Sequence, residues 1–366
     1  MIVITHGDIG GATNFVFWLA KGLREIGVDV KVGFGKGEYL REKLEREKIP
    51  FVNFRWLRRT YNPFFNLFFI FEIRKFLEDE RFDVVHFNSS NSLFGAFGAK
   101  FTDKKTKTVF TFHGLSILDP NYKKYSLMKF VFLAMFKFLL NFIDIPVFVS
   151  KNNLDVAKSI GLVKDGAVVY NGITQPEFYS REDAERFFEE KIGIELRDKF
   201  VIGSIGRLDY QKNYEFLIRI FPEILKLKQN AICIIVGDGP NKEGYYRLIK
   251  EYKLEDKVFL IGKVQDALKY LRRFDLFVLP SRYEGLPLTL IEALFAEIPI
   301  LASNVGGNKE IVGEAACYKF DDVNDFLGKF KIIEDIKLDF IRLQNRFILK
   351  NMIDGYFRIY KSVISK

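Results

Sequence analysis

Two acidic residues lie close together in residues 281–293, SRYEGLPLTLIEA, and they are the first indication of chemistry in this chain. Glu284 precedes a Gly-Leu-Pro turn, and Glu292 follows inside a predicted helix. A pair of carboxylates is typical of glycosidases, in which the two groups stand on opposite sides of the scissile bond. Here both groups lie on one turn and one short helix, so their role depends on the residues around them.

Two cations follow the predicted strand KFVIGSIG. Arg207 comes directly after it, and Lys212 comes just before Asn213, which is suited to cap the next helix. Arginine binds phosphate oxygens with paired hydrogen bonds and lysine adds a point charge, so the two could neutralise a leaving diphosphate without a metal. A solvated loop with two surface cations is the alternative.

Two glycine pairs also follow predicted strands. Gly10 and Gly11 come after MIVIT, while Gly306 and Gly307 come after PILAS, with Glu310 at the start of the following helix. Paired glycines at a helix N-terminus let backbone N–H groups approach an anion. The first loop does not satisfy G-x-G-x-x-G, and an ordinary tight turn is the alternative there.

The turn GLPLT also begins a predicted helix, with Pro287 in its first turn. The N–H groups of that turn favour an anionic diphosphate, whereas Glu292, deeper in the helix, can reach a neutral hydroxyl pair such as a ribose diol. Loops that follow parallel strands meet at one edge of a sheet. We therefore expect these loops to converge.

Short apolar runs alternate with helical patterns along the whole chain. They are MIVIT, VDVKVGF, FDVVHF, KTVFTF and IPVFVS, and the rhythm restarts with KFVIGSIG, AICIIVG, KVFLIG, LFVLP and PILAS. This alternation predicts an α/β protein with two Rossmann-like domains, whose parallel sheets face each other across a cleft. We place the domain boundary near Gln175, which gives predicted domains over 1–175 and 176–348.

The composition narrows the class of protein further. The net charge of +9 points to an anionic partner, and the two cysteines, Cys233 and Cys317, form neither a disulfide framework nor a CxxC zinc motif. With only three histidines, we expect no metal site. The first residues read as a strand rather than a secretion signal, and no apolar run is long enough to cross a bilayer, so we expect a cytoplasmic protein.

Four motifs of the second predicted domain together resemble the signature of glycosyltransferase family 4. They are R-L-x-x-x-K at 207–212, GDGP at 237–240, PSRYEGLPLTLIEA at 280–293 and NVGGNKEIV at 304–312. The resemblance implies a GT-B architecture in which the N-terminal domain binds the acceptor and the second domain binds a nucleotide-sugar donor. It also implies transfer with retention of configuration, without a metal or other cofactor, and a C-terminal helix over 349–366 that returns to the first domain.

The resemblance assigns a role to each motif residue. Arg207 and Lys212 would hold the donor diphosphate, Glu292 the ribose hydroxyls and Glu284 a hydroxyl of the donor sugar, so the two carboxylates would grip the donor rather than act as an acid and base. The backbone expected to line the sugar and phosphate is that of Gly285, Leu286, Pro287 and Leu288. The loop with Gly306, Gly307 and Glu310 would support this site.

The first domain matches the family more loosely. TFHG resembles the family's histidine loop, so His113 would touch the donor sugar and join Glu284, Arg207 and Lys212 as the catalytic residues. Gly10 and Gly11 would lie near phosphate and acceptor, and Asn171, in YNGI, would lie at the hinge. A histidine satisfied by neighbouring backbone is the alternative for His113.

This chain departs from the family pattern at a few positions. Many relatives have glycine where this chain has Asn213 and Glu297, and neither residue touches the predicted chemistry. The loop after Gly10 and Gly11 continues ATNF instead of the acidic residues common among relatives. Because that loop faces the acceptor, the acceptor is the least defined part of the prediction.

Two basic, aromatic segments, 51–76 and 122–143, could form surface helices that lie in an anionic membrane interface. The alternative is that both are packing helices of the first domain. A peripheral place on the inner face of the cell membrane would suit a lipid-linked acceptor. We expect no nucleic acid partner, because the segments carry no recognised binding motif.

The predicted function is therefore a metal-independent, retaining hexosyl transfer from a nucleotide-sugar, with a UDP-sugar favoured on family frequency. The acceptor would be a hydroxyl of a lipid-linked sugar or glycan, in the synthesis of a cell-surface polysaccharide or glycoconjugate. Alternatives are a nucleotide-sugar epimerase of the same fold and a non-catalytic nucleotide-sugar-binding protein. A nicotinamide dehydrogenase is disfavoured because the chain lacks a G-x-G-x-x-G motif.

Overall fold

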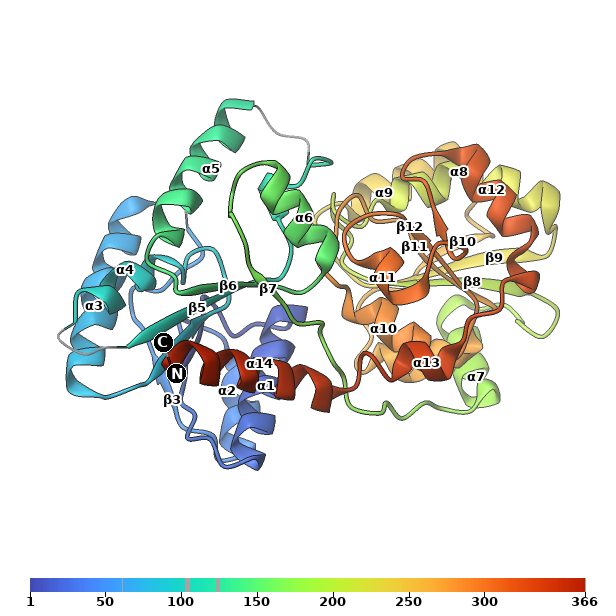
Figure 1. Cartoon of the computed structure of the whole chain (residues 1–366). Helices are drawn as coiled ribbons and strands as arrows, with labels where there is room; N and C mark the ends of the chain where they lie inside the picture. The colour runs from blue at the N-terminus through green and yellow to red at the C-terminus, as the bar shows by residue number, and fades with distance from the viewer. Residues whose placement is uncertain (61, 103–105, 123–125, 366) are drawn as a thin grey trace. The chain divides into compact units, whose positions relative to one another are not determined.

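The computed structural model describes residues 1–60, 62–102, 106–122 and 126–365. The chain divides into two compact units: unit 1 contains Met1–Gly172 and Ile348–Lys366, and unit 2 contains Ile173–Phe347. The last helix, α14 (Leu349–Ile364), lies beside α1 (Gly11–Glu25) of unit 1 (Figure 1). The chain thus leaves unit 1 after Gly172 and returns to it after Phe347.

Unit 1 is built on a seven-stranded parallel sheet in the order β3-β2-β1-β4-β5-β6-β7. Its strands are β1 (Ile2–Ile4), β2 (Val32–Phe34), β3 (Phe51–Asn53), β4 (Val84–Phe87), β5 (Lys107–Phe112), β6 (Ile145–Phe148) and β7 (Ala167–Val168). Besides α1 and α14, its helices are α2 (Glu38–Arg46), α3 (Pro63–Asp79), α4 (Phe94–Lys100), α5 (Ser126–Leu140) and α6 (Lys151–Ser159), with the 3-10 helix η1 (Ser116–Leu118).

Both faces of this sheet are covered by helices, which explains why its strands are apolar throughout. Val3 and Phe110 pack in a core with α3, α4, α5 and α6. Ile2 and Val109, one residue away on the same strands, pack on the other face with α1, α2 and α14. Successive side chains of a strand point to opposite faces, so each short strand contributes to both cores.

Unit 2 is built on a six-stranded parallel sheet in the order β10-β9-β8-β11-β12-β13. Its strands are β8 (Phe200–Ile205), β9 (Ala231–Val236), β10 (Val258–Leu260), β11 (Leu276–Leu279), β12 (Ile300–Ser303) and β13 (Cys317–Tyr318). Its helices are α7 (Arg181–Ile192), α8 (Tyr214–Leu227), α9 (Lys242–Glu251), α10 (Leu288–Phe295), α11 (Asn308–Val312), α12 (Val323–Lys331) and α13 (Phe340–Gln344), with the 3-10 helices η2 (Ala267–Arg273) and η3 (Ile333–Asp335). Helices α8, α9 and α12 close the core over one face, where Phe221, Ile249 and Phe326 are buried.

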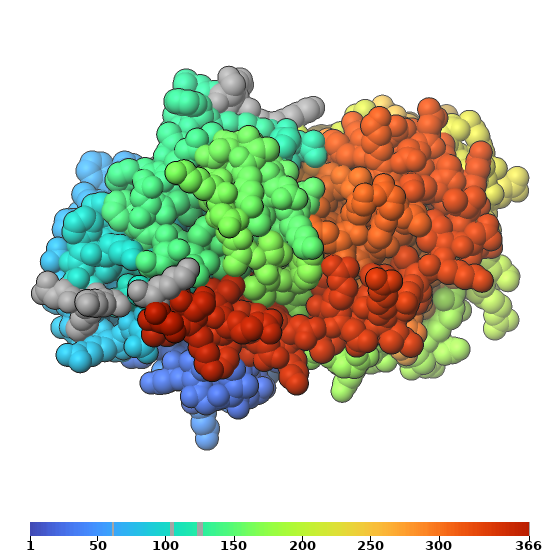
Figure 2. Space-filling view, in the orientation of Figure 1, coloured from blue at the N-terminus to red at the C-terminus, as the bar shows by residue number. Residues whose placement is uncertain are grey.

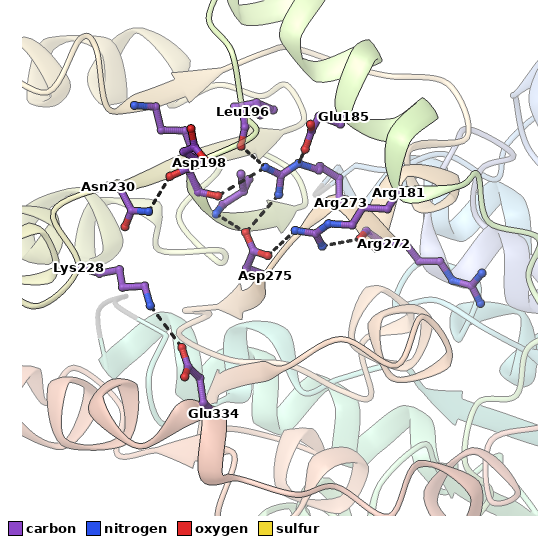
Figure 3. A network of polar contacts seen from close by, with 12 residues as sticks. Arg181, Glu185, Leu196, Asp198, Lys228, Asn230, Arg272, Arg273, Asp275 and Glu334 are labelled. Carbon is purple, nitrogen blue, oxygen red and sulfur yellow. Dashed lines mark hydrogen bonds and ion pairs between the residues drawn. The ribbon is translucent and has the colours of Figure 1, made fainter.

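A buried arginine ties the amino ends of this sheet to the helices beside it (Figure 3). The guanidinium of Arg273, in η2, is fully buried, and its Nε lies 2.7 Å from a carboxylate oxygen of Glu185 in α7. Asp275 accepts hydrogen bonds from Arg273 (3.2 Å), from Arg181 (2.6 Å) and from the backbone N–H of Val201 in β8 (2.7 Å). The network therefore joins α7, η2 and β8.

The fold class predicted from the sequence is confirmed, because both sheets are parallel and both have the Rossmann-like alternation of strand and helix. The prediction missed β3 and β13, which are edge strands of three and two residues. The run VVYNG also predicts a strand that ends at Asn171-Gly172, where the structure has β7, which ends at Val168. The reading of 51–76 as one helix is wrong at its start, since 51–53 form β3. Helix α3 begins only at Pro63, where the side chain of Asn62 caps it by accepting a hydrogen bond from the N–H of Phe64 (3.0 Å).

Parts of the two basic, aromatic segments, Tyr61, Lys123, Lys124 and Tyr125, lie outside the described residues. Within the described ranges, no helix combines the length and the apolar character that crossing a bilayer would require.

Candidate functional site

The strand order of each sheet reverses at one point, and parallel α/β sheets bind ligands at the carboxyl ends of the strands beside such a point. In unit 2 the reversal falls between β8 and β11. Arg207 and Lys212 follow β8, and Glu284 follows β11. The topology therefore places the predicted donor residues of unit 2 where this fold holds ligands.

Lys212 and Glu284 form an ion pair that is largely withdrawn from solvent. The Nζ of Lys212 lies 2.7 Å from Oε1 of Glu284, and the two side chains are 14% and 6% exposed. Ser281 donates a hydrogen bond to the same oxygen (2.7 Å), and the amide of Gln211 donates to Oε2 (3.2 Å). These contacts hold the carboxylate and the ammonium in fixed positions, as preorganised binding of a charged ligand requires.

The three loops that were expected to converge are packed against one another. The backbone N–H of Arg282 donates to the carbonyl of Gln211 (2.7 Å), which joins the loops after β8 and β11. The N–H of Gly307 donates to the carbonyl of Gly285 (2.8 Å), which joins the loops after β11 and β12. Gly306 has φ 51°, and a Cβ there would lie 2.1 Å from the carbonyl oxygen of Glu284, so only glycine allows this approach.

Arg207 lies at the same edge but is far more exposed. Its side chain is 59% exposed, and its Nε lies 3.8 Å from a carboxylate oxygen of Asp209. An exposed pair at that distance holds a side chain only weakly. The guanidinium can therefore swing toward an anionic ligand at little cost, whereas Lys212 is already fixed.

Helix α10 begins at Leu288, with Pro287 in the N-cap position rather than in the first turn as predicted. The hydroxyl of Thr289, in the first turn, is buried with no hydrogen-bond partner among the described residues. Glu292 lies one turn further on, and its side chain is partly exposed. The surrounding protein nevertheless removes enough water to raise the pKa of Glu292 to about 7, because desolvation penalises the charged carboxylate.

Two of the departures from the family pattern, Asn213 and Glu297, have a common structural explanation. Asn213 has φ 54° and Glu297 has φ 60°, both in the left-handed region that glycine adopts without strain. Asn213 does stand in the N-cap position of α8, as predicted, but its side chain makes no capping hydrogen bond. The chain therefore tolerates a side chain at two positions whose backbone favours glycine.

In unit 1 the reversal of strand order falls between β1 and β4. Gly10 is the N-cap of α1 and Gly11 its first residue, in the loop after β1. A Cβ on Gly10 would meet no heavy atom within 4 Å, so packing does not require glycine there. The space over this helix end is open to a larger group.

His113 follows β5 and is partly buried. Its Nε2 lies 3.3 Å from Oδ1 of Asn88, the residue directly after β4, and its ring packs edge-on against Phe15 of α1, with ring centroids 4.6 Å apart. Burial lowers the pKa of His113 to about 4. The imidazole is therefore neutral at neutral pH, and α1, β4 and β5 together hold it.

The second buried histidine of unit 1, His86, serves the C-terminal helix. Its two ring nitrogens lie 2.6 Å from the hydroxyl of Tyr360 and 2.7 Å from that of Thr111, which also contacts the Tyr356 hydroxyl (3.0 Å). Both tyrosines belong to α14, so this buried network fixes the returning helix on the first sheet. Since both ring nitrogens are occupied, His86 is a structural residue.

Asn171 and Glu310 were predicted as supporting residues. Asn171 is buried at the end of the first segment of unit 1, one residue before Gly172. Glu310 lies in the first turn of α11, and its backbone carbonyl accepts a hydrogen bond from Arg346 (3.0 Å). Asn171 therefore lies next to the point where the chain leaves unit 1. The bond from Arg346 joins α11 to the last residues of unit 2.

Three residues of the clusters were not predicted from the sequence: Gln211, Ser281 and Asn88. Gln211 and Ser281 are neighbours of the motif residues and could have been found as polar side chains beside Lys212 and Glu284. Asn88 begins the polar run NSSN directly after the strand FDVVHF, a place where ligand-binding residues are common. In the described parts of the chain, no group of three histidine, cysteine or acidic side chains is arranged to hold a metal ion.

The structure also has two hollows that lie outside these clusters. One, of about 200 Å³, lies at the amino ends of β1 and β4 and is lined by apolar residues such as Leu23, Phe82 and Phe357. The other, of about 450 Å³, lies beside α13 and is lined by Lys337 and Arg342 among others. Neither hollow contains a predicted site residue.

Comparison with known proteins agrees with the motifs and the fold. Two family models match, Glycosyltransferase Family 4 over residues 9–175 and Glycosyl transferases group 1 over residues 186–348. An uncharacterized glycosyltransferase of Methanocaldococcus jannaschii is 28% identical over 292 residues, which cover 76% of this chain and 68% of the relative. The UDP-Gal:alpha-D-GlcNAc-diphosphoundecaprenol alpha-1,3-galactosyltransferase of Escherichia coli is 26% identical, over 80% of this chain and 76% of the relative.

Among solved structures, HepE of Anabaena in complex with UDP-glucose superimposes with a TM-score of 0.81 at 21% identity, covering 99% of this chain and 100% of that chain. The fold and the matched models define a glycosyltransferase of the GT-B type. The chain belongs to glycosyltransferase family 4.

Proposed function

We propose that this glycosyltransferase moves a sugar from a nucleotide-sugar, with a UDP-sugar favoured, to a hydroxyl of a lipid-linked sugar or glycan. The transfer retains the anomeric configuration and needs no metal. The observation that carries the proposal is the buried Lys212–Glu284 pair at the reversal point of the second sheet, with Arg207 exposed beside it. Two cations and a fixed carboxylate suit a ligand that carries both a diphosphate and sugar hydroxyls.

In the proposed reaction the bond between the sugar C1 and the β-phosphate oxygen breaks through an oxocarbenium-like transition state. The acceptor oxygen bonds to C1 on the same face, and its proton passes to the departing phosphate. Arg207 and Lys212 stabilise the negative charge that develops on that phosphate, and Glu284 orients a sugar hydroxyl. Fixed donors of this kind contribute about 3–4 kcal/mol each to the transition state.

The donor nucleotide would extend along α10. The N–H groups at the start of this helix favour the diphosphate, and the buried, unpartnered hydroxyl of Thr289 adds a donor there. Glu292 would accept hydrogen bonds from the two ribose hydroxyls in its ionised form. The partial exposure of Glu292 is consistent with access from solvent.

The choice of donor and acceptor is supported by the relatives. The Escherichia coli enzyme is named for a UDP-sugar donor and an acceptor carried on diphosphoundecaprenol, and HepE was solved with UDP-glucose. Both names fit a UDP-sugar donor for this chain. The first supports a lipid-linked acceptor, in the synthesis of a cell-surface polysaccharide or glycoconjugate.

Attachment to an anionic membrane surface is part of the same proposal. Helices α3 and α5, which pack on the same face of the first sheet, leave large apolar side chains in solvent: Phe64 is 67% exposed, Phe71 59%, Leu127 73% and Phe130 67%. Further exposed apolar side chains on these helices are Leu67, Phe68, Met128, Val131 and Phe138. Helix α5 lies at the surface of unit 1 in Figure 2. We call this set the α3/α5 apolar face.

Exposed arginines stand beside that face. Arg58 lies 4.8 Å from the ring centroid of Phe65 in α3, and Arg55 lies 5.1 Å from that of Trp56. Apolar side chains flanked by cations match an interface of acyl chains and anionic headgroups, where each cation contributes about 1 kcal/mol. Phe69 and Phe136 of the same helices are buried core residues, so the alternative of packing helices is confirmed for that face, and the membrane assignment concerns the exposed face alone.

Release of nucleotide from a panel of UDP-, GDP- and ADP-sugars, each with and without EDTA, tests the donor assignment. We expect release from one donor that EDTA does not diminish and that Arg207→Ala reduces. Product analysis then separates transfer from the epimerase alternative, which would isomerise the donor without releasing nucleotide. If none of these donors is bound or turned over, the proposed function is wrong.

Co-sedimentation with vesicles tests the membrane assignment. The wild-type protein should sediment with vesicles of anionic phospholipid at low salt, and Phe64→Ser with Phe130→Ser should weaken this by about tenfold or more, given the transfer energy of two aromatic side chains. The matched control is Tyr246→Ser, an exposed aromatic residue of unit 2. Equal sedimentation of all three proteins would reject the α3/α5 apolar face as the attachment surface.

A further inference from the structure

The contact between His113 and Asn88 specifies where the imidazole proton lies. The side chain of Asn88 is almost fully buried, and its Nδ2 donates a hydrogen bond to the carbonyl oxygen of His86 (3.1 Å). This bond orients the amide, so the oxygen Oδ1 faces Nε2 of His113 at 3.3 Å. Because an amide oxygen only accepts hydrogen bonds, the ring nitrogen facing it must donate.

A neutral imidazole has one N–H donor and one acceptor nitrogen. If Nε2 carries the proton, Nδ1 carries a lone pair, and among the described residues no side chain or backbone group bonds to Nδ1. His113 is partly exposed, and its ring is held edge-on by Phe15. The histidine is thus fixed in place, with Nε2 hydrogen-bonded to Asn88 and Nδ1 available to accept a hydrogen bond from a ligand.

We propose that Asn88 is a positioning residue that holds His113 in the tautomer protonated on Nε2, so that His113 presents a hydrogen-bond acceptor to a hydroxyl of the bound ligand. His113 then acts neither as a cation nor as a proton donor. The ligand class is a polyhydroxylated group such as the donor sugar, and this part of the inference rests on the proposed function. The tautomer itself does not depend on that function.

The position of Asn88 supports this role. It directly follows β4, its backbone N–H donates to the carbonyl of Val3 in β1 (2.9 Å), and β1 and β4 are the strands between which the sheet order reverses. Asn88 is therefore held on both its backbone and its side chain. A rigid partner of this kind selects one tautomer of the histidine beside it.

Nitrogen NMR of the ligand-free full chain, labelled with ¹⁵N-histidine, tests the inference directly. The chain has three histidines, and His113→Gln assigns the signal of interest. At pH 7 the wild-type protein should show His113 with a protonated Nε2, a proton slow enough in exchange to give a cross-peak, and an unprotonated Nδ1. Asn88→Leu should lose that cross-peak, Asn88→Asp should keep it, and Asn91→Leu, in the same loop, should match wild type.

A wild-type His113 protonated on Nδ1, or on both nitrogens, would overturn the inference, as would an unchanged cross-peak in Asn88→Leu. If Asn88→Leu does not fold, the wild-type spectrum and Asn88→Asp still decide. In the donor-release assay, Asn88→Leu should lower kcat/KM by about tenfold, the usual value of one hydrogen bond to a ligand. Absence of any donor turnover with the expected tautomer would reject the proposed function and leave the tautomer assignment intact.

Discussion

Unit 2 contains two buried ion-pair clusters, one at each end of its sheet, and they differ in which elements they join. At the amino end, Arg273 is enclosed by Glu185, Asp275 and backbone carbonyls, and the cluster spans α7, η2 and β8 (Figure 3). At the carboxyl end, Lys212 and Glu284 join the loops that follow β8 and β11.

We propose that this difference separates a structural cluster from a ligand-binding one. A charge cluster that bridges helices to strands contributes to the fold, and its loss leaves buried charges without partners. A cluster on strand-end loops beside an exposed Arg207 is instead placed to meet a ligand. Under the proposed function, buried charge at the carboxyl ends of the strands marks the site, whereas buried charge elsewhere does not.

The largest effect expected from the comparison is on stability at the amino end. Arg273→Met should lower the free energy of unfolding of unit 2 by about 3–5 kcal/mol, because it leaves Glu185 and Asp275 without their central cation. Urea unfolding followed by circular dichroism measures this. Arg272→Met, its exposed neighbour, is the control and should change stability by less than about 1 kcal/mol. An Arg273→Met protein as stable as wild type would contradict the claim that the Arg273 cluster stabilises unit 2.

The second effect is on turnover at the carboxyl end. Lys212→Ala should reduce donor turnover by about 10²–10³, the usual cost of one preorganised donor to developing charge. It should destabilise unit 2 less than Arg273→Met, since Ser281 and Gln211 still bond to Glu284. Lys226→Ala, an exposed lysine paired within α8, is the control. Turnover equal to wild type in Lys212→Ala would place the reaction elsewhere.

The third effect is a pH dependence of nucleotide binding. Burial raises the pKa of Glu292 to about 7, and only the carboxylate accepts both ribose hydroxyl protons, so UDP affinity should fall about tenfold between pH 8 and pH 6. Titration calorimetry at pH 6, 7 and 8 measures the affinity for UDP. The Glu292→Gln variant should bind UDP weakly, with an affinity that does not change with pH. An unchanged slope in Glu292→Gln would assign the dependence to another group.

The same raised pKa of Glu292 also affects stability. Stability should fall as the pH rises, whereas the affinity for UDP should rise. The folded carboxyl of Glu292 keeps a proton that the unfolded chain has already released, so its contribution to stability is full below the ordinary pKa of 4.5. It is lost as the pH rises toward about 7. Under the proposed function, the carboxylate that would bind the ribose at high pH therefore lowers stability there.

The smallest effect concerns Asn213, between Lys212 and α8. Its side chain is buried, both of its polar atoms have no partner among the described residues, and its backbone is left-handed. Asn213→Gly should therefore raise the free energy of unfolding by about 1 kcal/mol, and Asn213→Ala should raise it less. Urea unfolding of the two variants compares them. Lower stability in Asn213→Gly would show that the amide has a bonding role after all.

The fold could be predicted from the sequence because every central strand is a run of apolar residues followed by a helical pattern. The edge strands β3 and β13 could not be predicted, because β3 (FVN) contains an exposed polar residue and β13 has only two residues. Lys212 and Glu284 belong to the motifs from which the site was predicted, and their assignment as site residues stays a prediction. Their direct contact could not be predicted, nor could the contact of His113 with Asn88, because pairs on different strands depend on the order of strands in the sheet.

The measurement that most directly tests the central claim is hydrogen exchange of the full chain with and without UDP, read by mass spectrometry. UDP should protect peptides that cover residues 207–213, 284–292 and 304–310, at the carboxyl ends of β8, β11 and β12. Peptides around Arg273 should exchange as before. Protection around Arg273 instead, or no protection anywhere with UDP, GDP or ADP, would contradict the assignment of the donor site to the Lys212–Glu284 cluster.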